Sequence, residues 1–100
     1  MSNSTFPTGP VAQSMAAKLQ TALEPSRLEI EDQSHLHAGH AHAKDLRAGE
    51  THFAVLVVAE GFRGQSRVQR QRQIYKILAD ELAAGVHALA LTALTPEENT

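Results

Sequence analysis

Histidine is the residue type in this sequence best suited to chemistry. The chain holds six histidines in 100 residues, and a cluster of them consists of His35, His37, His40 and His42. Histidine-rich tracts are typical of metal binding, and this spacing can place two imidazoles on one ion. The spacing specifies no particular metal, so by itself it slightly favours a solvated loop that binds nickel or zinc adventitiously.

The remaining two histidines fall in predicted strands. His87 begins a strand directly after a predicted helix end, and a lone histidine in such a place is more often structural than a metal ligand. His52 stands beside Phe53 in a strand that is apolar on both faces, which favours a structural role more strongly still. The residue pattern alone therefore gives neither histidine a chemical function.

A basic segment is the second chemical signal. The segment Gly61–Ala79 contains no acidic residue, although the formal net charge of the chain is −2. Its cations, the candidate contacts for nucleic acid or a protein partner, are Arg63, Arg67, Arg70, Arg72 and Lys76. Arg67 falls in the first turn of a predicted helix, where the helix dipole disfavours a cation by a few tenths to ~1 kcal/mol. This mismatch indicates an anionic partner about as strongly as it indicates a solvated helix face.

The sequence lacks the motifs of common enzyme classes. It has no cysteine, so it can form neither a disulfide nor a thiolate metal site on its own. It has no G-x-S-x-G, no phosphate-binding loop and no H-E-x-x-H. Gly61–Gly64 matches the GxxG pattern of KH nucleic-acid-binding domains, but it follows a strand instead of joining two helices. We therefore predict that the protein is not an enzyme.

Hydrophobic spacing predicts the elements of the first half of the chain. Apolar residues at steps of four predict a helix that begins near Val11 and that Pro25 ends. Alternation predicts a strand over Leu28–Glu31. A second strand over Thr51–Ala59 is apolar on both faces, so we expect it at the centre of a sheet. The histidine cluster falls in the long loop between these strands.

The residue pattern of the second half of the chain predicts a helical crossover between two strands. Ser66 is the predicted N-cap of a helix that ends near Ala84, with Gly85 as its C-cap. A third strand, Val86–Leu94, and a short last turn, Thr95–Glu98, follow. The apolar stripe predicted for the helix consists of Val68, Ile74, Tyr75, Leu78, Ala79 and Leu82. The residues predicted on the solvent side are Arg70, Arg72, Gln73, Lys76 and, partly exposed, Ile77.

Together these elements predict one α+β domain over residues 11–98, preceded by a flexible tail over residues 1–10. Their order is α-β-β-α-β-α, and a helical crossover returns the third strand parallel to the second. We expect a three-stranded mixed sheet with helices on one face. No secretory signal and no membrane-spanning stretch is visible, so we expect a cytoplasmic protein without membrane contact.

Six segments of the sequence resemble the BolA family in order and spacing. They are Ser34–His40, Glu50–Phe53, Phe62–Ser66, Arg70–Tyr75, Val86–Leu89 and Thr95–Glu98. Each motif is weak alone, but six in register are specific, and the resemblance covers roughly residues 11–98. It implies the BolA fold, which is similar to a class II KH domain.

The resemblance also implies a function. BolA proteins bind monothiol glutaredoxins that carry a CGFS active site, and the two proteins share a 2Fe–2S cluster. The glutaredoxin supplies its cysteine and a bound glutathione, and the BolA partner supplies histidine. The chain is therefore expected to be an adaptor in iron–sulfur cluster assembly, trafficking or iron regulation.

The resemblance carries over to individual histidines. His87 matches the histidine of the family's Val-His-Ala-Leu segment and is the expected first ligand. The second ligand is expected in the loop between the first two strands, where the family has His or Cys. We favour His37, which keeps its distance from the preceding Ser34, and then His40; the remaining alternatives are His42 and His35. Gln71 stands where the family usually has a histidine, so that position has no predicted role here.

Two rival functions remain. Some BolA proteins have been assigned as DNA-binding regulators, and the basic helix of this chain is compatible with that role. A simple histidine-rich metal buffer is the third hypothesis. The expected partners are therefore a monothiol glutaredoxin and, in the alternative, DNA, with an apo form that is a monomer or a weak dimer.

Overall fold

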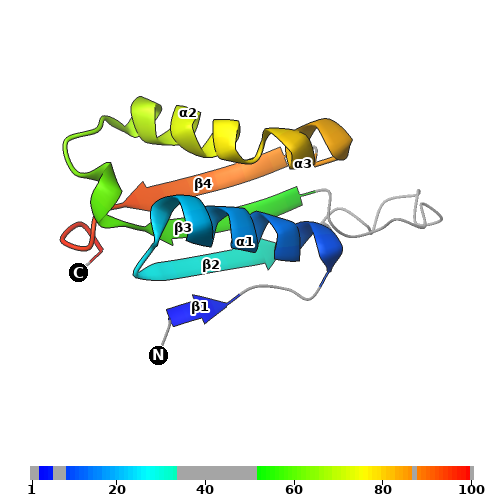
Figure 1. The fold of residues 1–100 in the computed structure, drawn as a ribbon, viewed down its shortest axis with the longest axis horizontal. Coiled ribbons are helices and arrows are strands. Elements are labelled where there is room, and N and C mark those ends of the chain that lie inside the picture. Colours follow the sequence, from blue (N-terminus) through cyan, green and yellow to red (C-terminus); the bar gives the residue numbers. More distant parts are fainter. Residues whose placement is uncertain (1–2, 6–8, 34–51, 87, 100) are drawn as a thin grey trace.

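The computed structural model describes residues 3–5 (backbone only), 9–33, 52–86 and 88–99. The strands are β1 (Asn3–Thr5), β2 (Arg27–Asp32), β3 (His52–Val58) and β4 (Ala88–Leu94). The helices are α1 (Pro10–Leu23), α2 (Arg67–Ile77) and α3 (Ala79–Ala84), with a 3-10 turn η2 (Glu60–Phe62). The α-helices lie over one face of a single sheet (Figure 1). None of these helices is long and apolar enough to cross a membrane.

The sheet is mixed and β3 is an inner strand, as predicted. The strand order is β1-β2-β3-β4. β2 runs antiparallel to β3, whereas β4 runs parallel to β3, from His52 opposite Ala88 to Val58 opposite Leu94. The parallel return requires the crossover that α2 and α3 provide. The α+β class and the arrangement of the three main strands with helices on one face are thus confirmed.

Alternation along the strands builds the core. In β3, Phe53, Val55 and Val57 are buried, while Ala54 and Leu56 are only partly buried. The buried side chains that meet them include Leu28 and Ile30 of β2, Met15 and Leu19 of α1, Ile74 of α2, and Leu78. The helical spacing of α1 and the period-two spacing of β2 therefore point to the same interior.

A short fourth strand, which the sequence analysis did not predict, lies within the segment expected to be a flexible tail over residues 1–10. Asn3–Thr5 pairs in parallel with Arg27–Glu29 at the outer edge of β2. A strand of three polar residues has no hydrophobic alternation, so the sequence pattern could not reveal it. Backbone hydrogen bonding to an open edge is sufficient to place such a segment.

The middle helix is divided in two, where the sequence predicted one continuous helix. The break is at Leu78 (φ −100°, ψ 19°). The new N-terminus places Glu81 in the first turn of α3, where acids are favoured. Glu81 accepts hydrogen bonds from Ser14 Oγ (2.5 Å) and Lys18 Nζ (3.1 Å) of α1. Burial raises the pKa of the Glu81 carboxyl, but these hydrogen bonds outweigh it and leave that pKa lowered.

The C-terminal segment closes a turn over residues 96–99 where a short helix was predicted. The predicted reciprocal contacts are present: Thr95 N donates to Glu98 Oε1 (2.8 Å), and Glu98 N donates to Thr95 Oγ1 (3.3 Å). Glu98 also reaches back to Arg70, at 2.7 Å from Oε1 to Nη1. This contact ties the end of the chain to α2.

Arg70 is buried, and this differs from its predicted solvent-facing position. It is 8% exposed, and its Nη1 donates to Ala93 O (2.9 Å) while its Nε donates to Gln65 O (3.0 Å). Its guanidinium lies 5.7 Å from the centroid of the Phe62 ring, within the range of a cation–π contact. α2 is rotated about its axis relative to the predicted stripe, so Arg70 turns inward.

Removal of the Arg70 side chain should destabilise the fold. Arg70→Ala would leave Glu98 and two backbone carbonyls without their donor, at a cost of about 2–4 kcal/mol. Urea unfolding followed by circular dichroism measures the difference. Arg72→Ala, on the exposed side of the same helix, is the control and should stay within about 0.5 kcal/mol of the wild type. Equal effects of the two substitutions would contradict a structural role for Arg70.

The Arg70–Glu98 pair also predicts a pH dependence of stability. The hydrogen bond from Arg70 lowers the pKa of the Glu98 carboxyl from 4.5 to about 2. A depressed pKa contributes stability above the unfolded-state value, and this contribution is lost as the pH falls from about 5 towards 2. Glu98→Gln should therefore lower Tm at pH 7 and give a Tm that converges with the wild type near pH 2. Thermal melts of both proteins between pH 7 and pH 2 test this dependence. A difference in Tm that stays constant with pH would exclude a contribution from the Arg70–Glu98 pair.

Candidate functional site

The predicted metal ligands His35, His37, His40, His42 and His87 lie outside the described residues. The structure does describe the residues that flank them. Gln33 follows β2 and precedes the histidine-rich segment, and His52 follows that segment at the start of β3. Val86 and Ala88 flank position 87 at the start of β4.

These flanking residues gather at one end of the sheet. Gln33 N donates to His52 O at 2.7 Å, and His52 is opposite Ala88 in the β3–β4 register. β2 ends where β3 and β4 begin, since β2 alone of these three runs in the opposite direction. With neighbouring strands ~4.8 Å apart, the end of β2 and the start of β4 are separated by about 10 Å. The two histidine-bearing segments therefore join the described fold close to one another.

The backbone beside position 87 is anchored on both sides. The Val86 side chain is buried in the core, and its N–H donates to Glu81 O at 3.3 Å. Ala88 is held in the parallel ladder opposite His52. Both neighbours of position 87 are therefore held in the described fold.

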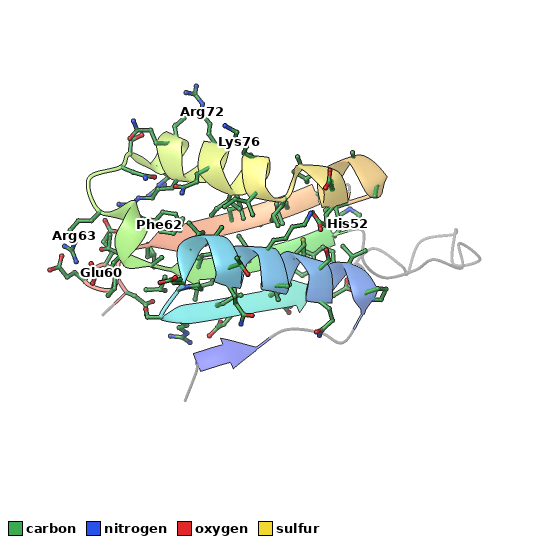
Figure 2. The ribbon with its side chains drawn as sticks, in the orientation of Figure 1. His52, Glu60, Phe62, Arg63, Arg72 and Lys76 are labelled. Carbon is green, nitrogen blue, oxygen red and sulfur yellow. The ribbon has the colours of Figure 1, made fainter. Side chains whose placement is uncertain are left out.

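His52 is the histidine that the structure describes. It is half-buried at the start of β3, at the same end of the molecule (Figure 2). Within residues 9–33, 52–86 and 88–99, no group of three His, Cys, Asp or Glu side chains could hold a metal ion. The described residues thus hold the chain on either side of the histidine-bearing segments, but they do not themselves form a metal site.

The described lysines and arginines fall into two groups. The first group is held by carboxylates: Lys18 by Asp80 and Glu81, Arg27 by Glu29, Arg63 by Glu60 and Glu97, and Arg70 by Glu98. The second group, for which the described residues provide no carboxylate partner, is Arg67, Arg72 and Lys76. All members of the second group lie on α2.

Arg63 illustrates why the basic segment is smaller than its sequence indicates. Its Nη2 is 2.8 Å from Glu60 Oε1 (Figure 2), and its Nη1 is 2.6 Å from Glu97 Oε1. The hydrogen bond to Glu60, followed by that to Glu97, raises the pKa of the Arg63 guanidinium. Two of the five cations proposed as contacts, Arg63 and Arg70, are therefore already neutralised by neighbouring carboxylates.

The outer face of α2 differs from its predicted composition. Arg72 and Lys76 project away from the sheet as expected (Figure 2). Val68 and Tyr75, which were predicted in the buried stripe, are 53% and 41% exposed. The sequence did contain a signal for this rotation, because Arg70, Ile74 and Ile77 also share one helical face.

A polar cleft lies between the start of α2 and the end of β4. Its volume is about 420 Å³, and it is lined by Gln65, Arg67, Arg70, Ala93, Leu94 and Glu98. The Arg70–Glu98 ion pair forms part of the wall, so the charge of Arg70 is compensated there. Arg67 is therefore the lining cation of this cleft for which the described residues provide no carboxylate.

Comparison with known proteins supports one family. The family model described as "BolA-like protein" matches residues 19–98. The chloroplastic protein BOLA1 of Arabidopsis thaliana is 48% identical over 88% of this chain, and the chain spans only 55% of that relative's length. The DNA-binding transcriptional regulator BolA of Haemophilus influenzae is 40% identical, over 88% of this chain and 80% of the relative.

Solved structures agree with this assignment. The structure of BolA1 from Arabidopsis thaliana superposes with a TM-score of 0.81 at 46% identity. The match covers 92% of this chain and 98% of that structure. Sequence and fold lead to the same conclusion: the chain belongs to the BolA-like protein family.

Proposed function

We propose that this chain is an adaptor that binds a monothiol glutaredoxin and shares a 2Fe–2S cluster with it through histidine, rather than an enzyme. The arrangement of the strand ends is the observation that carries the proposal. The described residues on either side of the histidine cluster and of His87 lie at the same end of the sheet, with Gln33 bonded to His52 and His52 opposite Ala88. Ligands from these two segments could then meet on one iron.

The donor set of the chain fits a shared cluster. The chain has no cysteine, so it cannot provide the thiolates that hold an iron–sulfur cluster. Imidazole can replace thiolate on one iron, as it does in Rieske centres. The chain would contribute His87 and one loop histidine, and the glutaredoxin and its glutathione would contribute sulfur.

The role of the fold in this proposal is to hold the ligand-bearing segments. Burial of Val86 and the ladder position of Ala88 fix the chain on both sides of His87. The contact between Glu81 and α1 fixes the helix that leads into this segment. A ligand whose chain neighbours are already ordered loses less conformational entropy when it binds.

Replacement of His87 should abolish cluster sharing. The chain is mixed with a CGFS glutaredoxin, glutathione, iron and sulfide, and visible absorption and circular dichroism are recorded. We expect a heterodimer spectrum distinct from that of the glutaredoxin homodimer, and we expect His87→Ala to lose it. Single alanine substitutions at His35, His37, His40 and His42 then identify the second ligand, with His37 expected to have the largest effect.

His52→Ala is the matched control, because His52 lies at the same end of the sheet but is not a proposed ligand. It should retain the heterodimer spectrum. If the mixture shows only the glutaredoxin spectrum with wild-type protein, cluster sharing is excluded. If all single histidine variants retain the heterodimer spectrum, the adaptor forms but histidine ligation is wrong.

DNA binding is the second candidate function. One relative bears the name of a DNA-binding transcriptional regulator, and α2 presents Arg67, Arg72 and Lys76 without carboxylate partners among the described residues. Arg63 and Arg70 are occupied by ion pairs. Any contribution of α2 to phosphate binding therefore rests on three cations.

Salt dependence tests this second function. Each phosphate contact contributes a slope of about −0.9 to a plot of log K against log salt, so three contacts contribute about −2.7. Substitution of Arg67, Arg72 and Lys76 by Ala should reduce the measured slope by that amount, whereas Arg63→Ala should change it little. Fluorescence anisotropy with duplex DNA provides the measurement. An unchanged slope in the triple variant would exclude α2 from DNA contact.

A further inference from the structure

The outer face of α2 combines exposed apolar side chains with cations. Val68 and Tyr75 are the exposed large apolar side chains of the described chain, at 53% and 41%. Both lie on α2, at positions that face the same side of the helix. Exposed apolar side chains that cluster in this way mark interaction surfaces.

The same face holds two of the three cations that the described fold leaves without a carboxylate, Arg72 and Lys76, and the third, Arg67, lies beside this face in the first turn of α2. Acidic residues are not scarce, since the chain has 11 of them against 9 lysines and arginines. Arg72 and Lys76 lie one and two turns after Val68, and Arg67 precedes it at the start of the helix. We name Arg67, Val68, Arg72, Tyr75 and Lys76 the α2 ridge.

The ridge is a rigid platform. The Tyr75 hydroxyl donates to Leu89 O of β4 over 3.5 Å. On the inner side of the helix, Ile74 is fully buried and Arg70 is bonded to Ala93 O and Glu98. Ser66 and Gln69 close a capping box at the start of the helix. A surface that is already ordered loses little entropy on binding.

From these observations we propose that the α2 ridge docks an acidic protein segment that also carries apolar side chains. Carboxylates of the partner pair with Arg67, Arg72 and Lys76, and its apolar side chains cover Val68 and Tyr75. Arginine and tyrosine are enriched in protein interfaces. This inference does not depend on the histidines and stands whether or not the chain shares a cluster.

A protein segment fits the ridge better than nucleic acid does. The ridge extends over about 14 Å, at 1.5 Å per helical residue. Carboxylates bound it at both ends: Glu98 lines the cleft beside Arg67, and Asp80, whose side chain is 93% exposed, follows Lys76 by one turn. Both carboxylates are ion-paired, Glu98 with Arg70 and Asp80 with Lys18, so a long polyanion would find no unpaired cation of the described chain beyond these ends, and its phosphates make no use of Val68. A short acidic segment needs no further cations, and its apolar side chains can cover Val68.

A titration with designed peptides tests the proposal. The probe is an amphipathic peptide of Leu and Glu, and the two controls replace Leu by Ser or Glu by Lys. Amide NMR spectra of the labelled full chain should show shifts over residues 67–76 with the Leu/Glu peptide. The Ser peptide should bind about tenfold more weakly, the equivalent of ~1.4 kcal/mol of lost apolar contact. The Lys peptide should not bind.

Variants of the ridge refine the test. Arg72→Glu and Val68→Ser should each weaken binding of the Leu/Glu peptide by about fivefold or more. The double variant Gln20→Glu/Thr21→Glu, on the exposed side of α1, changes the net charge by as much as Arg72→Glu and should bind normally. Circular dichroism confirms that each variant is folded before it is compared.

Several outcomes would overturn the proposal. Absence of shifts over residues 67–76, or equal binding of the Leu/Glu and Ser peptides, excludes an acidic and apolar partner. Tighter binding of duplex DNA than of the Leu/Glu peptide at the same residues assigns the ridge to nucleic acid. Concentration-dependent shifts of the ridge in the absence of peptide assign it to a second copy of this chain.

Discussion

The parallel pairing of β3 with β4 is the constraint on which the rest of the structure depends. It aligns His52 with Ala88 and Val58 with Leu94, and it requires the chain to travel the length of the sheet between the two strands. That return path is η2, α2 and α3. The positions of the helix that carries the cations and of the chain beside His87 are both consequences of this one pairing.

The pairing also explains why α2 has so large an exposed face. β4 is an edge strand, so the helix above it has the sheet on one side and solvent on the other (Figure 1). Leu89 and Leu91 of β4 are only half-buried beneath it. Polar contacts compensate for this thin apolar layer, since Arg70 joins α2 to Ala93 O and to the C-terminal turn. The same arrangement leaves Val68 and Tyr75 outside.

The sequence was sufficient for those elements in which local pattern and tertiary packing agree. β3 was predicted because its run of apolar residues covers both faces, and α1 because its apolar stripe is bounded by Pro25. β1 was missed because three polar residues carry no period. The rotation of α2 was missed because a long side chain such as Arg70 can be buried when its charge is paired, which a hydrophobic period does not register.

The candidate site was harder to predict from the sequence than the fold, for a different reason. Composition and spacing drew attention to the loop histidines, but only the resemblance to the BolA family selected His87 and ranked the loop histidines as ligands. For the cations, the sequence identified the basic segment but not which of its residues are paired with a carboxylate in the fold. Glu60, Glu97 and Glu98 lie outside that segment in sequence, yet they contact Arg63 and Arg70 in the fold. A count of charges along the chain cannot include such partners.

The charge pattern that results separates two regions of one small domain. At one end of the sheet, the residues that flank the histidines come together. The chain has histidine side chains but no cysteine to contribute as metal ligands. Along α2, ion pairs remove Arg63 and Arg70 from the basic segment and leave a short cationic strip with apolar side chains between its charges. Phosphates can pair only with the cations of this strip, whereas a protein segment can also cover its apolar side chains. Its composition is closer to that of a protein interface.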